Sequence, residues 1–178
     1  MKLYEADRAL GSSACGKRAF RTADLALVFA EDGTKLRSTI ARLVKAGALQ
    51  HVARDLYWYA RADSPAVPAI EELAVALRPG EMNFIGMESA ASLWNVISQI
   101  PVDRLTVVTT GKEGEFETPF GTIEFVHTSR DRTYLLDHTI DYPNHALRLA
   151  TKEHTVRGLV RSGRSLDLVD WGEVNADE

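Results

Sequence analysis

The sequence has few of the features that mark secreted, membrane-spanning or metal-binding proteins. Cys15 is its only cysteine, which excludes an internal disulfide and any zinc or redox site of the C-x-x-C type. The longest stretch without a charged residue, 89–102, is too short and too polar to span a bilayer. The segment 1–8 is charged and lacks the apolar run of a signal peptide. We therefore expect a cytoplasmic protein without a membrane span.

Charge is distributed unevenly along the 178 residues. Residues 1–62 hold 11 Lys and Arg against 6 Asp and Glu, a net charge of +5, whereas the remainder holds 10 against 19, a net charge of −9. Pro65 and Pro68 lie where the sign changes. We predict a domain at 1–62, a linker at 63–68 and a second domain at 69–178. A basic domain of this size suits a polyanionic partner.

The first part has the element order of a known kind of DNA-binding domain. Hydrophobic spacing predicts three helices, and two β-prone runs separated by Arg54 and Asp55 predict a hairpin. A short glycine-containing turn joins the second and third helices, as in a helix-turn-helix. With the hairpin added, the order predicts a winged helix-turn-helix. The predicted elements are helices at 4–10, 23–30 and 35–46 and strands at 49–53 and 56–60.

One face of the predicted helix 35–46 is basic. Its apolar stripe consists of Leu36, Ile40, Leu43 and Val44. The opposite face has cations and no carboxylate, whereas a merely solvated face normally mixes both signs. In a helix-turn-helix this face lies in the major groove of DNA. We predict DNA contacts on this face by Lys35, Ser38, Arg42 and Lys45, and on its flanks by Arg37 and Thr39. Contacts with neighbouring phosphates are predicted for Lys17, Arg18, Arg21 and Arg54.

The second part alternates between helical and strand-like patterns. It predicts a mixed α/β domain, so the whole chain belongs to the α+β class. The tail after Gly163 contains apolar residues that we expect to pack back on this domain. The predicted elements are helices at 69–78, 87–98 and 147–161, a short buried strand or turn at 83–86, strands at 104–110, 113–117 and 121–126, and a loop at 134–144.

Three glutamates raise the alternative of a nucleic-acid enzyme. Glu113, Glu115 and Glu117 alternate along a predicted strand, so their carboxylates share one face, as in a metal-dependent nuclease. No lysine follows at the E-x-K spacing of such nucleases, and like charges in register are typical of a solvated sheet edge. The sequence also lacks G-x-S-x-G, P-loop and dinucleotide-binding motifs. We predict a protein that is not an enzyme and has no cofactor.

A second polar group raises the alternative of a metal site. It consists of Asp137, His138, Asp141 and His145. Pro143 breaks any helix among them, so the i, i+4 spacing of a zinc-binding helix is not available. Scattered polar residues in this pattern are typical of a loop. We therefore predict no metal site here.

Several motifs of the chain match the pattern of one protein family. An aromatic-Ile-Gly-x-x-Ser-Ala helix start lies at 84–90, a Val-rich strand at 105–110 and a Gly-x-Ile-x-Phe strand at 121–125. The run 149–153 is similar to an Ala-Thr-x-Glu helix start, with Lys152 where the family often has proline. With the predicted winged helix ahead of them, these motifs resemble the AbiEi family. Its members are antitoxins of type IV toxin–antitoxin systems, which act in abortive infection.

This resemblance implies a DNA-binding transcriptional autorepressor whose second domain counteracts a nucleotidyltransferase toxin without forming a stable complex with it. One recognition helix covers only a few base pairs, so we expect a duplex operator with an inverted repeat, occupied by two molecules. Two alternatives remain. One is a plain winged-helix transcription factor with an effector- or protein-binding second domain, and the other is a nucleic-acid enzyme that uses the Glu113 strand.

Overall fold

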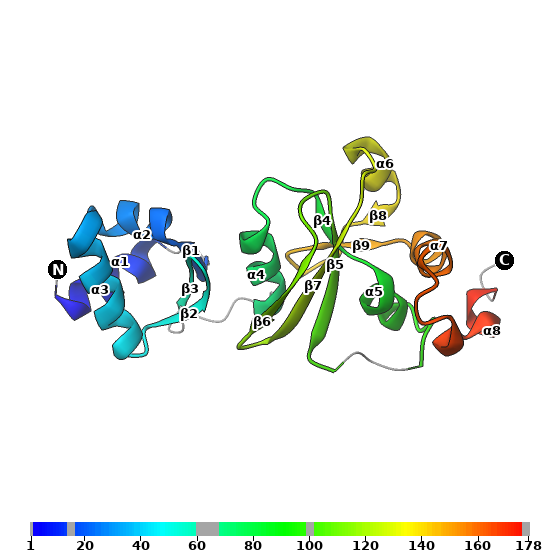
Figure 1. The fold of residues 1–178 in the computed structure, drawn as a ribbon, viewed down its shortest axis with the longest axis horizontal. Helices are drawn as coiled ribbons and strands as arrows, with labels where there is room; N and C mark the ends of the chain where they lie inside the picture. Colours follow the sequence, from blue (N-terminus) through cyan, green and yellow to red (C-terminus); the bar gives the residue numbers. More distant parts are fainter. Residues whose placement is uncertain (1, 14–16, 60–67, 99–101, 176–178) are drawn as a thin grey trace. The chain divides into compact units, whose positions relative to one another are not determined.

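The computed structural model describes residues 2–13, 17–59, 68–98 and 102–175. The chain forms two compact units, 1–67 and 68–178, and each has its own helices and its own sheet (Figure 1). The α+β class predicted from the sequence is confirmed. Of the predicted linker, 63–68, only Pro68 lies within the described residues, where it precedes the first helix of the second unit.

Within residues 2–13 and 17–59, the first unit has three helices and a three-stranded antiparallel sheet with strand order β1-β3-β2. The predicted hairpin is confirmed, with Arg54 and Asp55 at its turn. The strand β1 was not predicted, because its three residues are too short to show alternation, yet Ala19 pairs with Trp58 of β3. The elements are α1 (Leu3–Ser13), β1 (Ala19–Arg21), α2 (Thr22–Phe29), α3 (Gly33–Lys45), β2 (Leu49–Ala53) and β3 (Leu56–Tyr59).

Apolar residues of all three helices and of the sheet form the core of this unit. Leu10, Phe20, Leu25 and Leu43 are among its buried members, and Leu49 of β2 is one of the residues by which the hairpin contributes to this core. The helix α1 continues past Gly11 to Ser13, so the predicted end of the helix at residue 10 was wrong. A glycine costs a helix only about 1 kcal/mol, which the burial of Leu10 on the same turn offsets.

The second unit is a six-stranded mixed sheet with strand order β6-β7-β5-β4-β9-β8. The pairs β5–β7 and β4–β9 are parallel, and the others are antiparallel. The helix α4 lies on one face of this sheet, and α5 and α7 lie on the other (Figure 1). The elements are α4 (Ala69–Leu77), β4 (Asn83–Ile85), α5 (Met87–Leu93), β5 (Arg104–Thr109), β6 (Gly114–Thr118), β7 (Gly121–His127), α6 (Arg132–Asp137), β8 (Thr139–Ile140), β9 (Arg148–Ala150), α7 (Lys152–Ser162), the 3-10 helix η1 (Leu166–Leu168) and α8 (Trp171–Val174).

Two predictions for the second half of this unit were wrong. The predicted helix 147–161 begins as the strand β9, and only α7 is helical, because the Thr151 hydroxyl caps α7 by accepting the backbone N–H of His154. Leu149 and Ala150 are buried beside β4 and favour the sheet there. The predicted loop 134–144 contains most of α6 and all of β8.

The helix α5 is shorter than predicted and ends at Leu93. Beyond it, the indole N–H of Trp94 donates to the carbonyl of Ala150 at 2.8 Å. Ile97 then forms a β-bridge with Val169, which is buried as predicted for the tail. The remaining strands of the sheet and the helix α4 agree with the prediction to within one or two residues. In the described part of the chain, no helix combines the length and apolar character that a membrane span requires.

Candidate nucleic-acid interface

The helix α3 separates a buried apolar side from an exposed basic side. Leu36, Ile40 and Leu43 are buried as predicted. Val44 is exposed, so its predicted place in the buried stripe was wrong, and the fourth buried residue of the helix is Thr39. The exposed side of the helix carries Lys35, Arg37, Ser38, Arg42 and Lys45. No acidic residue lies between Gly33 and Lys45, so this side has only positive charge.

The side chains of Lys35, Arg37 and Arg42 contact the helix itself or the turn before it. The Lys35 ammonium lies 3.5 Å from the Glu31 carboxylate. The Arg37 guanidinium donates to the Thr34 hydroxyl at 3.3 Å, and the Nε–H of Arg42 donates to the Ser38 carbonyl at 3.3 Å. The Lys35 side chain is 69% exposed. Because the Lys35–Glu31 ion pair is long and Lys35 is largely solvated, an approaching anion can reach the Lys35 ammonium.

Thr39 is buried rather than on the flank of the exposed face. Its residue is 2% exposed, and its hydroxyl donates to the Glu31 carboxylate at 2.6 Å. This hydrogen bond is the main reason why the pKa of Glu31 is lowered from its ordinary value. The same hydroxyl accepts a hydrogen bond from Nη2 of Arg42 at 3.1 Å. Thr39 is thus part of the support of the basic face and does not form its surface.

The predicted flanking residues differ in their surroundings. Arg18 is buried, and its guanidinium lies 4.7 Å from the ring centroid of Trp58. Lys17 forms an ion pair with Asp24 at 2.8 Å. Arg54 is exposed at the turn of the hairpin. Arg21 is half-buried, and its backbone N–H donates to the Asp24 carboxylate at 2.8 Å, which fixes the start of α2.

The structure adds exposed residues that sequence patterning did not identify. Thr34 and Ala41 lie on the exposed side of α3, one turn from Ser38 in either direction. Gln50 and His51 are exposed on β2 of the hairpin. A helical wheel of the predicted helix would have placed Ala41 among the basic residues. Its side chain has neither a charge nor a hydrogen-bonding group, so its chemistry did not indicate a contact with DNA.

The three glutamates of the second unit lie at a sheet edge. The strand β6 is the last in the sheet and pairs only with β7. Glu113 precedes this strand, and Glu115 and Glu117 are exposed on it. The Glu115 carboxylate accepts a hydrogen bond from Arg104 at 2.8 Å. The Glu115 carboxylate therefore forms an ion pair with Arg104 of β5 in the same sheet.

Three of the four residues of the predicted polar group, His138, Asp141 and His145, have partners of their own. His138 stacks on Tyr134, and its Nδ1–H donates to the Tyr134 carbonyl. Asp141 pairs with an arginine of β9, and His145 pairs with a glutamate of α4. Among residues 2–13, 17–59, 68–98 and 102–175, no group of three or more His, Cys, Asp and Glu side chains is arranged to hold a metal ion.

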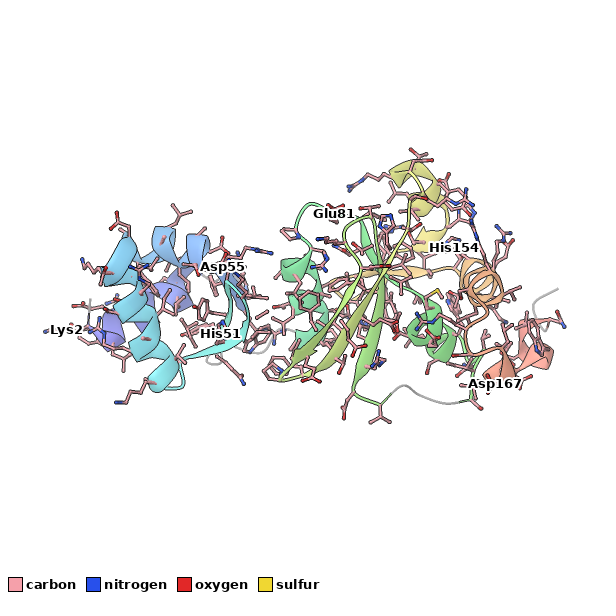
Figure 2. All side chains as sticks on the ribbon, in the orientation of Figure 1. Lys2, His51, Asp55, Glu81, His154 and Asp167 are labelled. Carbon is pink, nitrogen blue, oxygen red and sulfur yellow. The ribbon has the colours of Figure 1, made fainter. Side chains whose placement is uncertain are left out.

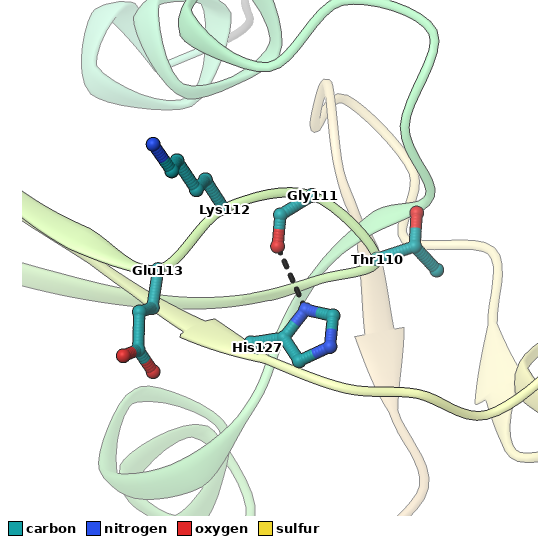
Figure 3. A pocket seen from close by; sticks show the side chains of 5 residues that line it. All are labelled: Thr110, Gly111, Lys112, Glu113 and His127. Carbon is teal, nitrogen blue, oxygen red and sulfur yellow. Dashed lines mark hydrogen bonds between the residues drawn. The ribbon is translucent and has the colours of Figure 1, made fainter.

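An open hollow of about 480 Å³ lies where the parallel strands β5 and β7 end (Figure 3). It is lined by Thr110, Gly111, Lys112, Glu113 and His127. The imidazole of His127 donates to the Gly111 carbonyl at 2.8 Å, and the Thr110 hydroxyl donates to Glu81 at 2.6 Å. Its two charged side chains, Lys112 and Glu113, are of opposite sign, so the hollow has no marked preference for an anion or a cation.

Comparisons with known proteins bear on the fold alone. No family model matches the sequence, and no curated protein matches it. Among solved structures, the chain is similar to the RV2827C protein from Mycobacterium tuberculosis, with a TM-score of 0.59 and 13% sequence identity. The similarity covers 88% of this chain, which spans 59% of the length of that protein. At this level of sequence identity the similarity supports the α+β architecture and gives no information about function.

Proposed function

We propose that the protein is a DNA-binding transcriptional repressor whose first unit is a winged helix-turn-helix. The observation that carries this proposal is the exposed face of α3, which holds four cations and no carboxylate. Two features support it. The helices α2 and α3 are joined by a short turn, and the β2–β3 hairpin follows them in the place of a wing.

In this proposal α3 enters the major groove. Arg37 and Arg42 are suited to the acceptor pair on a guanine edge, and Ser38 makes an adaptable contact. Lys35 and Lys45 lie at the two ends of the exposed face, where phosphates are the expected partners. Arg54, at the hairpin turn, is suited to a flanking phosphate. Buried Thr39 and Arg18 are left out of the proposed contact surface.

The proposed binding has a direct test. Duplexes are selected from a random library by the full chain, and the affinity for the selected duplex is measured by gel shift over a salt series. We expect a steep loss of affinity with rising salt, because each neutralised phosphate releases condensed counterions. Arg42→Ala should cost about 1–3 kcal/mol of discrimination between selected and shuffled duplex. Arg161→Ala, which removes the same charge from the second unit, is the control.

We further propose that the repressor is the antitoxin of a type IV system and counteracts a nucleotidyltransferase toxin. This assignment rests on the sequence resemblance of motifs such as 84–90 and 121–125 to the AbiEi family. Its test is co-expression with the product of the neighbouring gene, scored for growth. Rescue of growth supports the antitoxin, and selective DNA binding without rescue favours a plain winged-helix transcription factor. Footprints on the operator should show an inverted repeat bound by two molecules.

A further inference from the structure

A carboxylate is buried in the turn immediately before α3. Glu31 lies between α2 and α3, and 1% of its side chain is exposed. Burial of an ionised carboxylate is costly unless hydrogen bonds and charges compensate for the lost water. An apolar side chain of similar size often serves stability as well or better at a buried position. The presence of a carboxylate here therefore calls for a role besides stability.

Glu31 is connected to the exposed face of α3 through Thr39. The Thr39 hydroxyl has one hydrogen to donate and two lone pairs that can accept. It donates to Oε2 of Glu31 at 2.6 Å and accepts from Nη2 of Arg42 at 3.1 Å. The Nε–H of Arg42 also donates to the Ser38 carbonyl at 3.3 Å. Two donors of the planar Arg42 guanidinium are therefore held, which fixes the orientation of its plane.

We propose that Glu31 and Thr39 are positioning residues that orient the Arg42 guanidinium for recognition of a base edge. This inference rests on the proposed DNA-binding function and deepens it. Recognition of guanine requires two parallel hydrogen bonds from one guanidinium plane, so an arginine that is already oriented loses less side-chain entropy on binding. Because Glu31 is buried beneath the face, its charge supports Arg42 without standing between the helix and the phosphates.

A second threonine–arginine pair on α3 provides a comparison. Arg37 donates to the Thr34 hydroxyl at 3.3 Å, with the same i, i+3 spacing as Arg42 and Thr39. Thr34 is exposed, whereas Thr39 is buried and bonded to a carboxylate. Hydrogen bonds assisted by a charge are about twice as strong as neutral ones, and chains of them reinforce one another. We therefore expect Arg42 to be held more firmly than Arg37.

The first experiment measures discrimination, defined as the affinity ratio between the duplex selected by the full chain and a shuffled duplex of the same composition. Thr39→Val keeps the shape and removes the hydroxyl, so discrimination should fall about tenfold. Thr39→Ser restores the hydroxyl and should retain most of the discrimination. Glu31→Gln keeps an oxygen acceptor and removes the charge, so a loss of about threefold is expected. Circular dichroism checks that each variant is folded at the temperature of the assay.

A double-mutant cycle separates positioning from general damage to the fold. If Thr39 acts through Arg42, Thr39→Val should cause no further loss of discrimination in the Arg42→Ala background. A loss of the same size in both backgrounds overturns the inference. Thr155→Val, which removes an equally buried threonine hydroxyl from the second unit, is the matched control, and an equal loss from this variant also overturns the inference.

A measurement without DNA completes the test. In the free full chain, the Nε–H resonance of Arg42 should exchange with water more slowly in the wild type and in Thr39→Ser than in Thr39→Val. Equal exchange in all three overturns the inference. A wild-type chain that selects no duplex refutes the proposed function and this inference with it. A selective chain whose Thr39→Val variant keeps full discrimination refutes the inference alone.

Discussion

His154 contains the only buried side-chain nitrogen or oxygen without a hydrogen-bond partner in the part of the chain that the structure describes. The atom is Nδ1 of its imidazole, at the start of α7 (Figure 2). Burial lowers the pKa of His154, and charge interactions with His138, Arg157 and Arg130 lower it further, against an opposing effect of Glu153. The folded state therefore favours the neutral ring.

The lowered pKa of His154 predicts a loss of stability in acid. The unfolded chain protonates this histidine near its ordinary pKa of about 6.5, whereas the folded chain protonates it only at lower pH. The unfolded state therefore binds more protons as the pH falls through 6.5, and the free energy of unfolding declines. Urea titrations at about pH 7.5 and 5.5 should show a smaller decline for His154→Gln than for the wild type. His127→Gln, at an exposed histidine of the same unit, serves as the control; an equal decline in His154→Gln and the wild type would contradict the prediction.

Two glycines should respond to alanine with opposite signs. A methyl group on Gly86 would lie 2.5 Å from Cγ2 of Val108, so Gly86→Ala must displace a buried side chain and should destabilise the second unit by about 1–3 kcal/mol.

Gly11 lies inside α1, where a methyl group would lie 3.8 Å from the Tyr59 hydroxyl. Gly11→Ala should stabilise the first unit by about 0.5–1 kcal/mol. Urea unfolding followed by circular dichroism measures both, and the same sign for both variants would show that local space does not decide the outcome.

At the scale of elements, the sequence predicted those whose periodicity is local. The stripe of Leu36, Ile40 and Leu43 located α3, and alternation located the hairpin and β5 to β7. The strands β1 and β9 were missed because three residues carry no period, and each is a strand only because a partner, β3 or β4, lies beside it. The basic face of α3 was predictable because the helical spacing that locates the buried stripe also locates the residues on the opposite side of the helix. The burial of Thr39 was not, because it depends on Glu31 from the preceding turn.

The cap of α7 is an element-scale feature that can be tested by itself. The Thr151 hydroxyl accepts the backbone N–H of His154 at 3.3 Å, which satisfies one donor at the open end of the helix. Thr151→Ala should lower the free energy of unfolding of the second unit by about 1 kcal/mol, and Thr151→Ser should restore it. Urea titrations compare the three proteins. If alanine were neutral, the boundary between β9 and α7 would be set by packing against β4 alone.

At the scale of the whole molecule, the two units have separate cores and opposite charge. Residues 1–67 carry 11 basic and 7 acidic groups, a net charge of +4, whereas 68–178 carry 10 basic and 18 acidic groups, a net charge of −8. The basic unit buries its own apolar residues, among them Phe20 and Leu43, and the acidic unit buries others, among them Phe84 and Ile123. A separate core is the physical condition for a unit that folds alone.

Separate cores and opposite charge predict a division of labour between the two units. The fragment 1–67 should bind the selected duplex with steep salt dependence, because it contains α3 and most of the basic excess. The fragment 68–178 should not bind it, because its net negative charge is repelled by the phosphate backbone. If the second unit carries antitoxic activity, 68–178 should still rescue at least part of the growth lost to the neighbouring toxin. Gel shifts and growth assays on both fragments, with circular dichroism to confirm folding, measure these outcomes. A folded 68–178 fragment that rescued no growth would assign neutralisation to repression by the intact chain instead.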